Sequence, residues 1–138
     1  YTAISYQWGA DLKPFEIQTP EGPLFVTASL NFALRHIRDS TIKILVWVDA
    51  ICINQLDDYE RKIQVRRMKD IYRSAENVFA YIGEESDRSS EALETLAQIR
   101  TAALQPTLGH RTLRRFLKLL SRGWFRRAWV TQELVLAK

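Results

Sequence analysis

The sequence predicts an α/β domain in which a mainly parallel sheet lies between two layers of helices. Three apolar, strand-like runs, at 1–8, 42–48 and 77–83, alternate with segments of helical periodicity. This alternation is typical of parallel sheets with right-handed crossovers. The middle run, IKILVWV, is rich in β-branched residues and contains one polar residue, Lys43. It is therefore expected to be the central strand, buried on both faces.

The first part of the chain is expected to contain a strand, a loop and a helix. The strand at 1–8 ends before a glycine. The following segment, 11–23, contains three prolines and a glycine, so it is expected to be a loop with room for a short strand at 15–18. Thr27 is a suitable N-cap for a helix that runs to about Arg38.

A second helix is expected between Asp57 and about Ala75. Asp57 can cap this helix, and Glu60 stands three residues later, where it completes a capping box. Much of the surface of this helix is basic. Its predicted buried face consists of residues three or four positions apart, namely Val65, Met68, Tyr72 and Ala75.

Three further helices are expected after the third strand, because apolar residues again recur every three or four positions. They span 90–104, 112–122 and 125–137, with proline or glycine between them. The chain begins at Tyr1 rather than at Met, so residues 1–138 are expected to form a single domain of a longer protein. In the helix at 112–122, four side chains are expected to point inward: Leu113, Phe116, Leu117 and Leu120.

Composition limits the possible functions. The 138 residues suffice for one domain with a real core, and 20 basic against 16 acidic residues give a net charge of +4, which does not by itself imply nucleic acid. The single cysteine, Cys52, excludes an intramolecular disulfide and is expected to be a small buried residue. Two isolated histidines argue against a metal site. A reducing, cytoplasmic setting is favoured, and no apolar run reaches the roughly 18 residues that a membrane span needs.

Polar and aromatic side chains gather where the first two strands are expected to end. Open α/β folds place their ligands at this carboxyl edge of the sheet. Structural roles are alternatives, since Asp49 can cap the turn that follows it, the amides can fix the loop, and the aromatic rings can pack the strand end. The candidate binding residues are Ser5, Tyr6 and Trp8 after the first strand, and Asp49, Asn54 and Gln55 after the second.

A family resemblance is carried by four stretches: YTAISYQWG at 1–9, WVDAICINQLDDYERKIQVRRMKDIY at 47–72, ENVFAYIG at 76–83 and WFRRAWVTQELVLA at 124–137. Together they resemble the HET domain, the heterokaryon-incompatibility domain of filamentous fungi. Tyr81 stands where tryptophan is commoner in that family. The resemblance implies a signalling module of a longer protein in nonself recognition and programmed cell death. It also implies self-association and partners in a cell-death pathway.

HET domains are in turn similar in layout to TIR domains, which have a flavodoxin-like α/β fold. In that comparison AISYQWG corresponds to the first TIR strand, and WVTQE at 129–133 matches the W-x-x-x-E spacing of a TIR helix. The glutamate at that place is the catalytic residue of NAD hydrolysis in TIR enzymes. The resemblance therefore implies Glu133 as a catalytic residue and NAD as a substrate, without a bound cofactor.

The chemistry suits a single carboxylate. Cleavage of the bond between nicotinamide and ribose leaves an oxocarbenium-like centre, which a carboxylate can stabilise. On a helix, Trp129 and Glu133 share a face, so that the indole can stack on a base while the carboxylate reaches the sugar. Asp49, with the neighbouring amides, is expected to bind hydroxyls, and Arg61 is expected to hold a phosphate.

Alternatives stay open at this stage. Glu133 can be a surface residue or pair with Arg126 or Arg127, and Trp129 can be a core residue. The sequence contains no glycine-rich phosphate loop, which favours the rival interpretation of a non-catalytic module that signals by self-association. The basic helix faces lack the interleaved aromatic residues of a nucleic-acid site, so they are expected to be solvated or to contact a partner domain.

Overall fold

The computed structural model describes residues 1–86, 88–101, 109–128, 130 and 133. At its centre is a parallel sheet in the order β4-β1-β5, formed by β1 (Thr2–Tyr6), β4 (Val46–Trp47) and β5 (Asn77–Tyr81). β1 pairs along its whole length with β5, but it pairs with β4 only at its first two residues. The predicted α/β class with a parallel sheet is confirmed.

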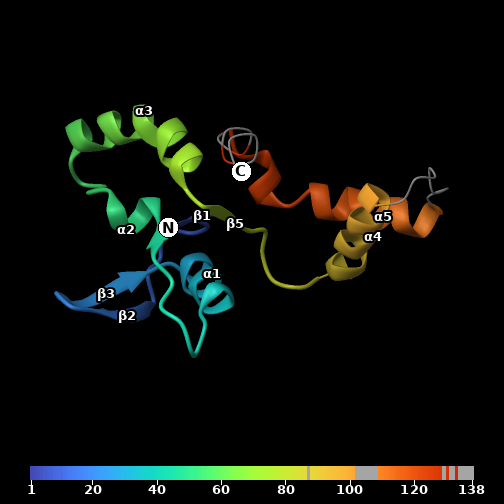
Figure 1. The fold of residues 1–138 in the computed structure, drawn as a ribbon, viewed down its shortest axis with the longest axis horizontal. Coiled ribbons are helices and arrows are strands. Elements are labelled where there is room, and N and C mark those ends of the chain that lie inside the picture. The colour runs from blue at the N-terminus through green and yellow to red at the C-terminus, as the bar shows by residue number, and fades with distance from the viewer. Residues whose placement is uncertain (87, 102–108, 129, 131–132, 134–138) are drawn as a thin grey trace.

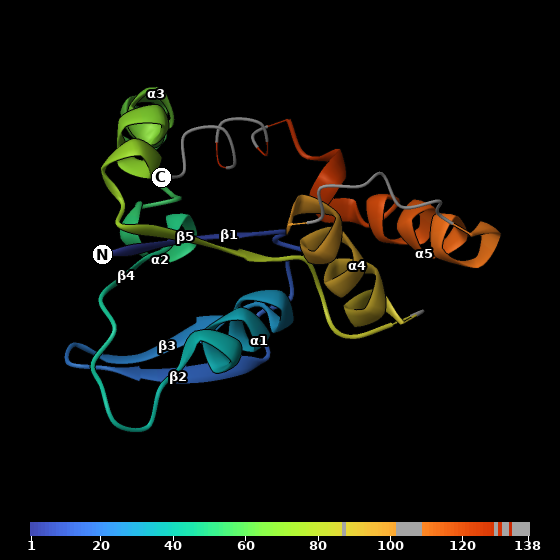
Figure 2. The same ribbon diagram turned by 45° about the vertical axis from the view of Figure 1, so that its right-hand side comes forward.

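Helices and a hairpin cover the two faces of this sheet (Figure 1). Figure 2 shows α3 (Asp58–Ser74) on one side of β1 and β5. The other side is covered by α1 (Ala28–Ile37) and by an antiparallel hairpin of β2 (Phe15–Thr19) and β3 (Gly22–Val26). The domain therefore has the three layers that the sequence predicts.

Each face of β1 belongs to a separate apolar core. Side chains alternate along a strand, so Ala3 packs on the α3 side with Met68 and Tyr72, whereas Ile4 packs on the α1 side with Leu30. Met68 and Tyr72 are the buried residues of α3, which confirms its predicted inner face. Because both cores share β1, this strand positions both layers.

The prediction that 42–48 forms the central strand is wrong. β4 contains two residues and lies at the edge of the sheet, and Ile42 and Leu45 are 64% and 74% exposed. The central strand is β1, in which Ala3, Ile4 and Ser5 are almost fully buried. A β-branched apolar run indicates strand propensity, but burial on both faces depends on which strand acquires neighbours, and long-range pairing decides that.

The segment expected to be a loop contains the hairpin. The short strand expected at 15–18 is confirmed as β2, whereas β3 is hidden in the sequence by Pro23. Proline is tolerated there because a two-stranded ribbon leaves many of its backbone groups outside the ladder. Gly22, next to the turn, has a φ of +126°, a conformation that favours glycine.

Both predicted N-caps are confirmed. The side chain of Thr27 accepts a hydrogen bond from the N–H of Leu30 at the start of α1, and Asp57 accepts hydrogen bonds from two N–H groups at the start of α3. The predicted capping box is not completed, however. Glu60 reaches past Asp57, and its Oε1 atom accepts a hydrogen bond from the N–H of Asn54.

Beyond β5, α4 (Ser89–Thr101) and α5 (His110–Leu120) form a helical hairpin. In both ribbon views this hairpin extends away from the sheet (Figures 1 and 2). Ala92 of α4 packs with Phe116 and Leu119 of α5 in a third apolar cluster. The contact is therefore narrow and covers one side of each helix.

The predicted inner face of the helix at 112–122 is only partly correct. Phe116 is buried as predicted, but Leu113, Leu117 and Leu120 are 47%, 60% and 54% exposed, and Leu119 is buried instead. The sequence shows a wide apolar arc, whereas α4 covers only a part of it.

The start of the helix predicted at 125–137 is wrong: Phe125 and Arg126 belong to a 3-10 turn, η1 (Gly123–Arg126), and residues 127 and 128 are not helical. Val130 and Glu133 are helical, and the remaining positions from 129 onward lie outside the described residues, as do positions 102–104 of the helix predicted at 90–104. Among the described residues, no helix combines the length and the apolar character needed to cross a membrane.

Candidate functional site

The carboxyl end of β1 holds polar side chains on both faces of the sheet. Ser5 points to the α3 side, and Tyr6 packs in the core on the α1 side, because side chains alternate along the strand. A carboxylate lies on each side. Glu133 contacts Ser5, and Asp49 contacts Trp8, which follows the strand.

Glu133 is fully buried, with 0% of its side chain exposed. Arg127 holds it in a bidentate ion pair, with Nη2–Oε1 and Nη1–Oε2 distances of 2.9 and 3.0 Å. The hydroxyl of Ser5 donates to Oε2 of Glu133 and accepts a hydrogen bond from Nε1 of Trp124 at 2.8 Å. Both carboxylate oxygens of Glu133 therefore accept hydrogen bonds, and Glu133 is held against the central strand.

The charges of Glu133, Asp49 and Arg127 act on Tyr72 of α3. Its hydroxyl donates to the backbone oxygen of Ile4 at 3.3 Å. Burial raises the pKa of Tyr72 above its ordinary value, the negative charges of Glu133 and Asp49 raise it further, and Arg127 opposes them. Tyr72 is therefore a neutral hydrogen-bond donor at physiological pH.

On the other side of the sheet end, Asp49 begins α2 (Asp49–Cys52). Its Oδ2 atom accepts a hydrogen bond from Nε1 of Trp8 at 2.9 Å, and its Oδ1 atom accepts one from the N–H of Ala50 at 2.8 Å. The side-chain amide of Gln55 donates to the backbone oxygen of Asp49 at 2.8 Å. Asp49 therefore organises the turn after β4 and also anchors the exposed indole of Trp8.

Arg127 links the two sides electrostatically. Burial raises the pKa of Asp49 above its ordinary value, and the hydrogen bond from Trp8 and the charge of Arg127 oppose that rise. For Tyr6, burial raises the pKa most, Asp49 raises it further, and Arg127 opposes. One guanidinium thus acts on Asp49 and Tyr6 as well as on Glu133.

A hollow of about 280 Å³ opens beside Trp8. Trp8 and Gln55 line it near the sheet end, Phe25 lines it from β3, and Asp11 and Lys13 add one charge of each sign. Its volume is just below the range of roughly 300–1,000 Å³ that is usual for small-molecule pockets. The hollow therefore adjoins the Asp49 side of the sheet end rather than the buried carboxylate of Glu133.

Residues 1–133 match the family described as "Heterokaryon incompatibility protein (HET)". The chain belongs to the HET family. The resemblance predicted from the sequence is thus confirmed. This HET domain is similar to Heterokaryon incompatibility protein 6, OR allele, of Neurospora crassa, with 38% identity over 112 residues, which cover 72% of this chain and 16% of that relative. The chain therefore spans a small part of the length of the relative.

Comparison of the HET domain with solved structures finds no match. The likeness to TIR domains consequently rests on the first strand and on the WVTQE spacing at 129–133. It stays a prediction here.

Most of the site residues predicted for the HET domain lie at one end of its sheet. Asn54 and Arg61 are exposed and make loop and helix contacts: Asn54 Oδ1 accepts a hydrogen bond from the N–H of Leu56 at 3.1 Å, and Arg61 pairs with Asp58 at 2.6 Å. Trp129 lies outside the described residues. The predicted residues that the structure brings to the sheet end are Ser5, Tyr6, Trp8, Asp49, Gln55 and Glu133.

Three residues of this group are not singled out by sequence reasoning as site residues, namely Trp124, Arg127 and Tyr72. The sequence offers Arg127 only as an ion-pair partner of Glu133, and the structure shows that pair. The available signal was the position of all three in stretches that carry the HET resemblance.

Cys52, expected to be buried, is exposed. It is the last residue of the short helix α2, in which no residue is buried. Among the described residues, no cluster of three or more His, Cys, Asp or Glu side chains is suited to a metal ion.

Asp49→Asn is expected to remove a pH dependence of stability. Because the folded-state pKa of Asp49 lies above its ordinary value of 3.8, folding favours the protonated carboxyl. This contribution to stability is fully present below the unfolded pKa and is lost as the pH rises through the folded pKa. Urea denaturation from about pH 3 to about pH 7 should show the wild type losing stability relative to the variant as the pH rises.

The control for that series is Asp70→Asn, which removes one negative charge from an exposed position of α3. A constant difference in unfolding free energy between wild type and Asp49→Asn across the pH range would contradict the raised pKa.

Proposed function

We propose that this HET domain acts in heterokaryon incompatibility, as the signalling part of a longer fungal protein whose activation leads to programmed cell death. The family match and the similarity to an incompatibility protein of Neurospora crassa support this role. The chain corresponds to 16% of that relative. The proposal therefore assigns nonself recognition to the full-length protein, together with its partners in a cell-death pathway.

For the chemistry, we infer hydrolysis of NAD with Glu133 as the catalytic residue. The observation that carries this inference is the position of the carboxylate, which lies at the end of the central strand and is oriented by Arg127 and Ser5. In the reaction, the bond between the ribose carbon and the nicotinamide nitrogen breaks, and its electron pair leaves with nicotinamide. The carboxylate stabilises the positive charge that develops on the ribose, and water then adds to that carbon and releases a proton.

Substrate access to Glu133 requires a movement. The carboxylate has no exposed surface. Trp124 of η1 donates a hydrogen bond to Ser5, and Arg127, which follows η1, donates to the carboxylate itself. In the proposed active state, η1 moves away from β1, and the activating signal favours that state by binding it more tightly. The hollow beside Trp8, on the other side of the sheet end, then supplies an aromatic surface for the adenine of NAD, with Asp49 and Gln55 as partners for the hydroxyls of the adenosine ribose.

Glu133→Gln is expected to lower the release of nicotinamide from NAD by at least about 100-fold, because a neutral amide does not stabilise the developing cation. Nicotinamide is measured by chromatography at high protein concentration, so that an active state that needs assembly can form. Far-UV circular dichroism confirms that the variant is folded.

The matched control for this assay is Glu94→Gln, which changes an exposed glutamate of α4 and should leave turnover unchanged. If folded Glu133→Gln turns over NAD as fast as the wild type, Glu133 has no part in the mechanism.

The burial of Glu133 also favours a second function. A carboxylate with both oxygens bonded and no exposed surface suits a purely structural ion pair, and the sequence contains no glycine-rich phosphate loop. The alternative is a non-catalytic module that signals by self-association. It predicts assemblies in analytical ultracentrifugation and no nicotinamide release by the wild type at any protein concentration, whereas release by the wild type excludes it.

A further inference from the structure

The surface of α5 divides into three stripes, which follow from its sequence HRTLRRFLKLL. Phe116 and Leu119 form the first stripe, which is buried and packs with Ala92 of α4. Residues three or four positions apart share a side of a helix, so the rest of the helix carries two further stripes. These are a leucine stripe of Leu113, Leu117 and Leu120, and a cation stripe of Arg111, Arg114, Arg115 and Lys118.

The leucine and cation stripes adjoin on the side of α5 that faces away from α4. Successive residues of a helix are turned by about 100°, which places Arg114 about 60° from Leu117 and far from the buried pair Phe116 and Leu119. The outward surface of α5 is therefore half leucine and half cationic.

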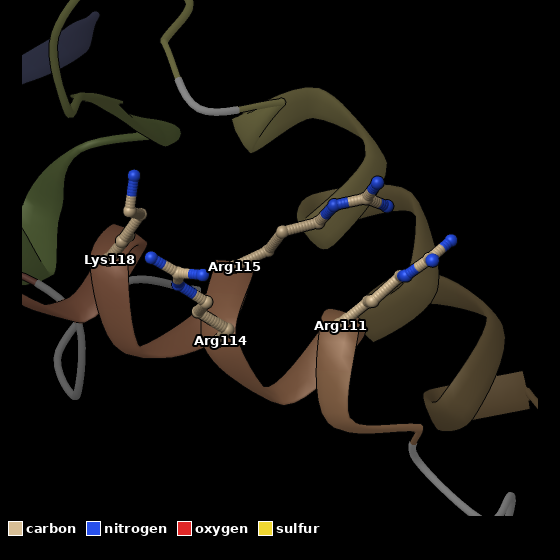
Figure 3. Close-up of a pocket in the computed structure, with 4 residues that line it drawn as sticks. All are labelled: Arg111, Arg114, Arg115 and Lys118. Atoms are coloured by element: carbon tan, nitrogen blue, oxygen red, sulfur yellow. The ribbon is translucent and has the colours of Figure 1, made fainter.

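The cation stripe forms a shallow hollow of about 180 Å³. Figure 3 shows its four side chains rising from α5, with α4 behind the helix. Arg115 pairs with Glu91 of α4, but no acidic side chain in the described part of the chain pairs with Arg111 or Arg114. Because α5 itself contains no Asp or Glu, the hollow is suited to an anion from outside the chain.

The leucine stripe is exposed apolar surface. Its three side chains are between 47% and 60% exposed, and α4 adds exposed Leu93 and Leu96. The α4–α5 hairpin extends away from the sheet in both ribbon views (Figures 1 and 2), so the described body of the domain leaves this face open. The leucines of α5, three or four positions apart, form a contiguous apolar stripe along the helix, and contiguous exposed apolar surface marks an interaction site.

We propose that α5 docks on the surface of a bilayer that contains anionic lipids, with its leucine stripe at the acyl boundary and with Arg111 and Arg114 of its cation stripe on the lipid phosphates. A helix with leucines on one side, Arg and Lys beside them and no acidic residue has the composition of helices that lie in the membrane interface. The leucines gain hydrophobic free energy on leaving water. Each Arg or Lys near an anionic surface strengthens binding roughly fivefold.

The composition of this face separates a lipid surface from a protein partner. The apolar half of this face is leucine alone, and neither exposed stripe contains Trp or Tyr. Leucine is under-represented among the residues that dominate binding between proteins, whereas Trp and Tyr are enriched there. A second copy of α5 is disfavoured as well. It would bring two cation stripes together without an acidic residue between them.

Sedimentation of the 138-residue chain with lipid vesicles tests the proposal. We expect the chain to sediment with vesicles of phosphatidylcholine and phosphatidylserine and to stay in solution with vesicles of phosphatidylcholine alone. Arg111→Gln/Arg114→Gln is expected to weaken binding to the mixed vesicles roughly 25-fold. Leu113→Ser/Leu117→Ser is expected to weaken it at least about tenfold, and both variants should stay folded by circular dichroism because the changed side chains are exposed.

Arg66→Gln/Arg67→Gln is the matched control, because it removes the same charge from exposed positions of α3. It should bind the mixed vesicles as the wild type does. An equal loss in this control would show that binding depends on net charge alone, and it would overturn the proposal, as would the absence of binding to the mixed vesicles. Binding that is insensitive to the leucine variant would reduce the face to a phosphate site. Self-association that the leucine variant abolishes, without vesicle binding, would assign the face to a second copy.

Discussion

Arg127→Met is expected to lower the free energy of unfolding by about 3 kcal/mol. The substitution leaves the carboxylate of Glu133 in the interior with no cationic partner, since Arg127 supplies both hydrogen bonds of the bidentate pair. We expect the lower part of the range for broken buried pairs because Arg127 itself keeps 18% of its side chain exposed. Urea denaturation at neutral pH, followed by tryptophan fluorescence, measures the loss.

Arg126→Met is the control for that substitution. Arg126 is adjacent in sequence but exposed, so its change should stay within about 0.5 kcal/mol. The double variant Arg127→Met/Glu133→Leu should recover much of the lost stability, because a buried ion pair can often be replaced by apolar residues at little cost. A loss below about 1 kcal/mol for Arg127→Met alone would show that water screens the pair.

Trp124→Ala is expected to destabilise the domain by about 3–5 kcal/mol. Trp124 is buried, its ring meets Phe125 edge-on at a centroid distance of 4.9 Å, and its Nε1 atom donates to Ser5. Its removal leaves a cavity between η1 and the central strand and removes a donor from the hydroxyl that contacts Glu133. Thermal and urea denaturation of the purified variant provide the measurement.

Trp124→Phe separates packing from hydrogen bonding. The phenyl ring keeps most of the apolar contact with Phe125, but it cannot donate to Ser5, so the expected loss is about 1 kcal/mol. A similar loss for Trp124→Phe and Trp124→Ala would mean that the hydrogen bond, rather than the packing of the indole, anchors η1.

Elements that depend on neighbouring residues could be predicted from the sequence. Thr27 and Asp57 cap α1 and α3 as expected, because a cap involves residues only two or three positions apart. The apolar run 42–48 and Leu117 could not be placed in the same way. Whether such side chains are buried depends on which distant element covers them, and neither β-branched content nor helical spacing contains that information.

The candidate site, too, could be predicted only in part. Its place at the carboxyl edge of the sheet could be predicted, because ligands of open α/β folds bind at the carboxyl ends of strands. The contact of Ser5 with Glu133 joins residues 128 positions apart, and no local pattern indicates it. The family resemblance is what implies a role for Glu133, and its catalytic role stays a prediction.

Within this domain, the central strand is synthesised first and completed last. β1 leaves the ribosome long before its neighbour β5, and the carboxylate that the Ser5 hydroxyl contacts comes 128 positions after it. Pairings at such sequence separation slow folding and prolong the time for which strand edges are open to other chains. The nascent domain should therefore keep the edges of β1 open until the helix that carries Glu133 has emerged, and its tertiary structure should form only after that point.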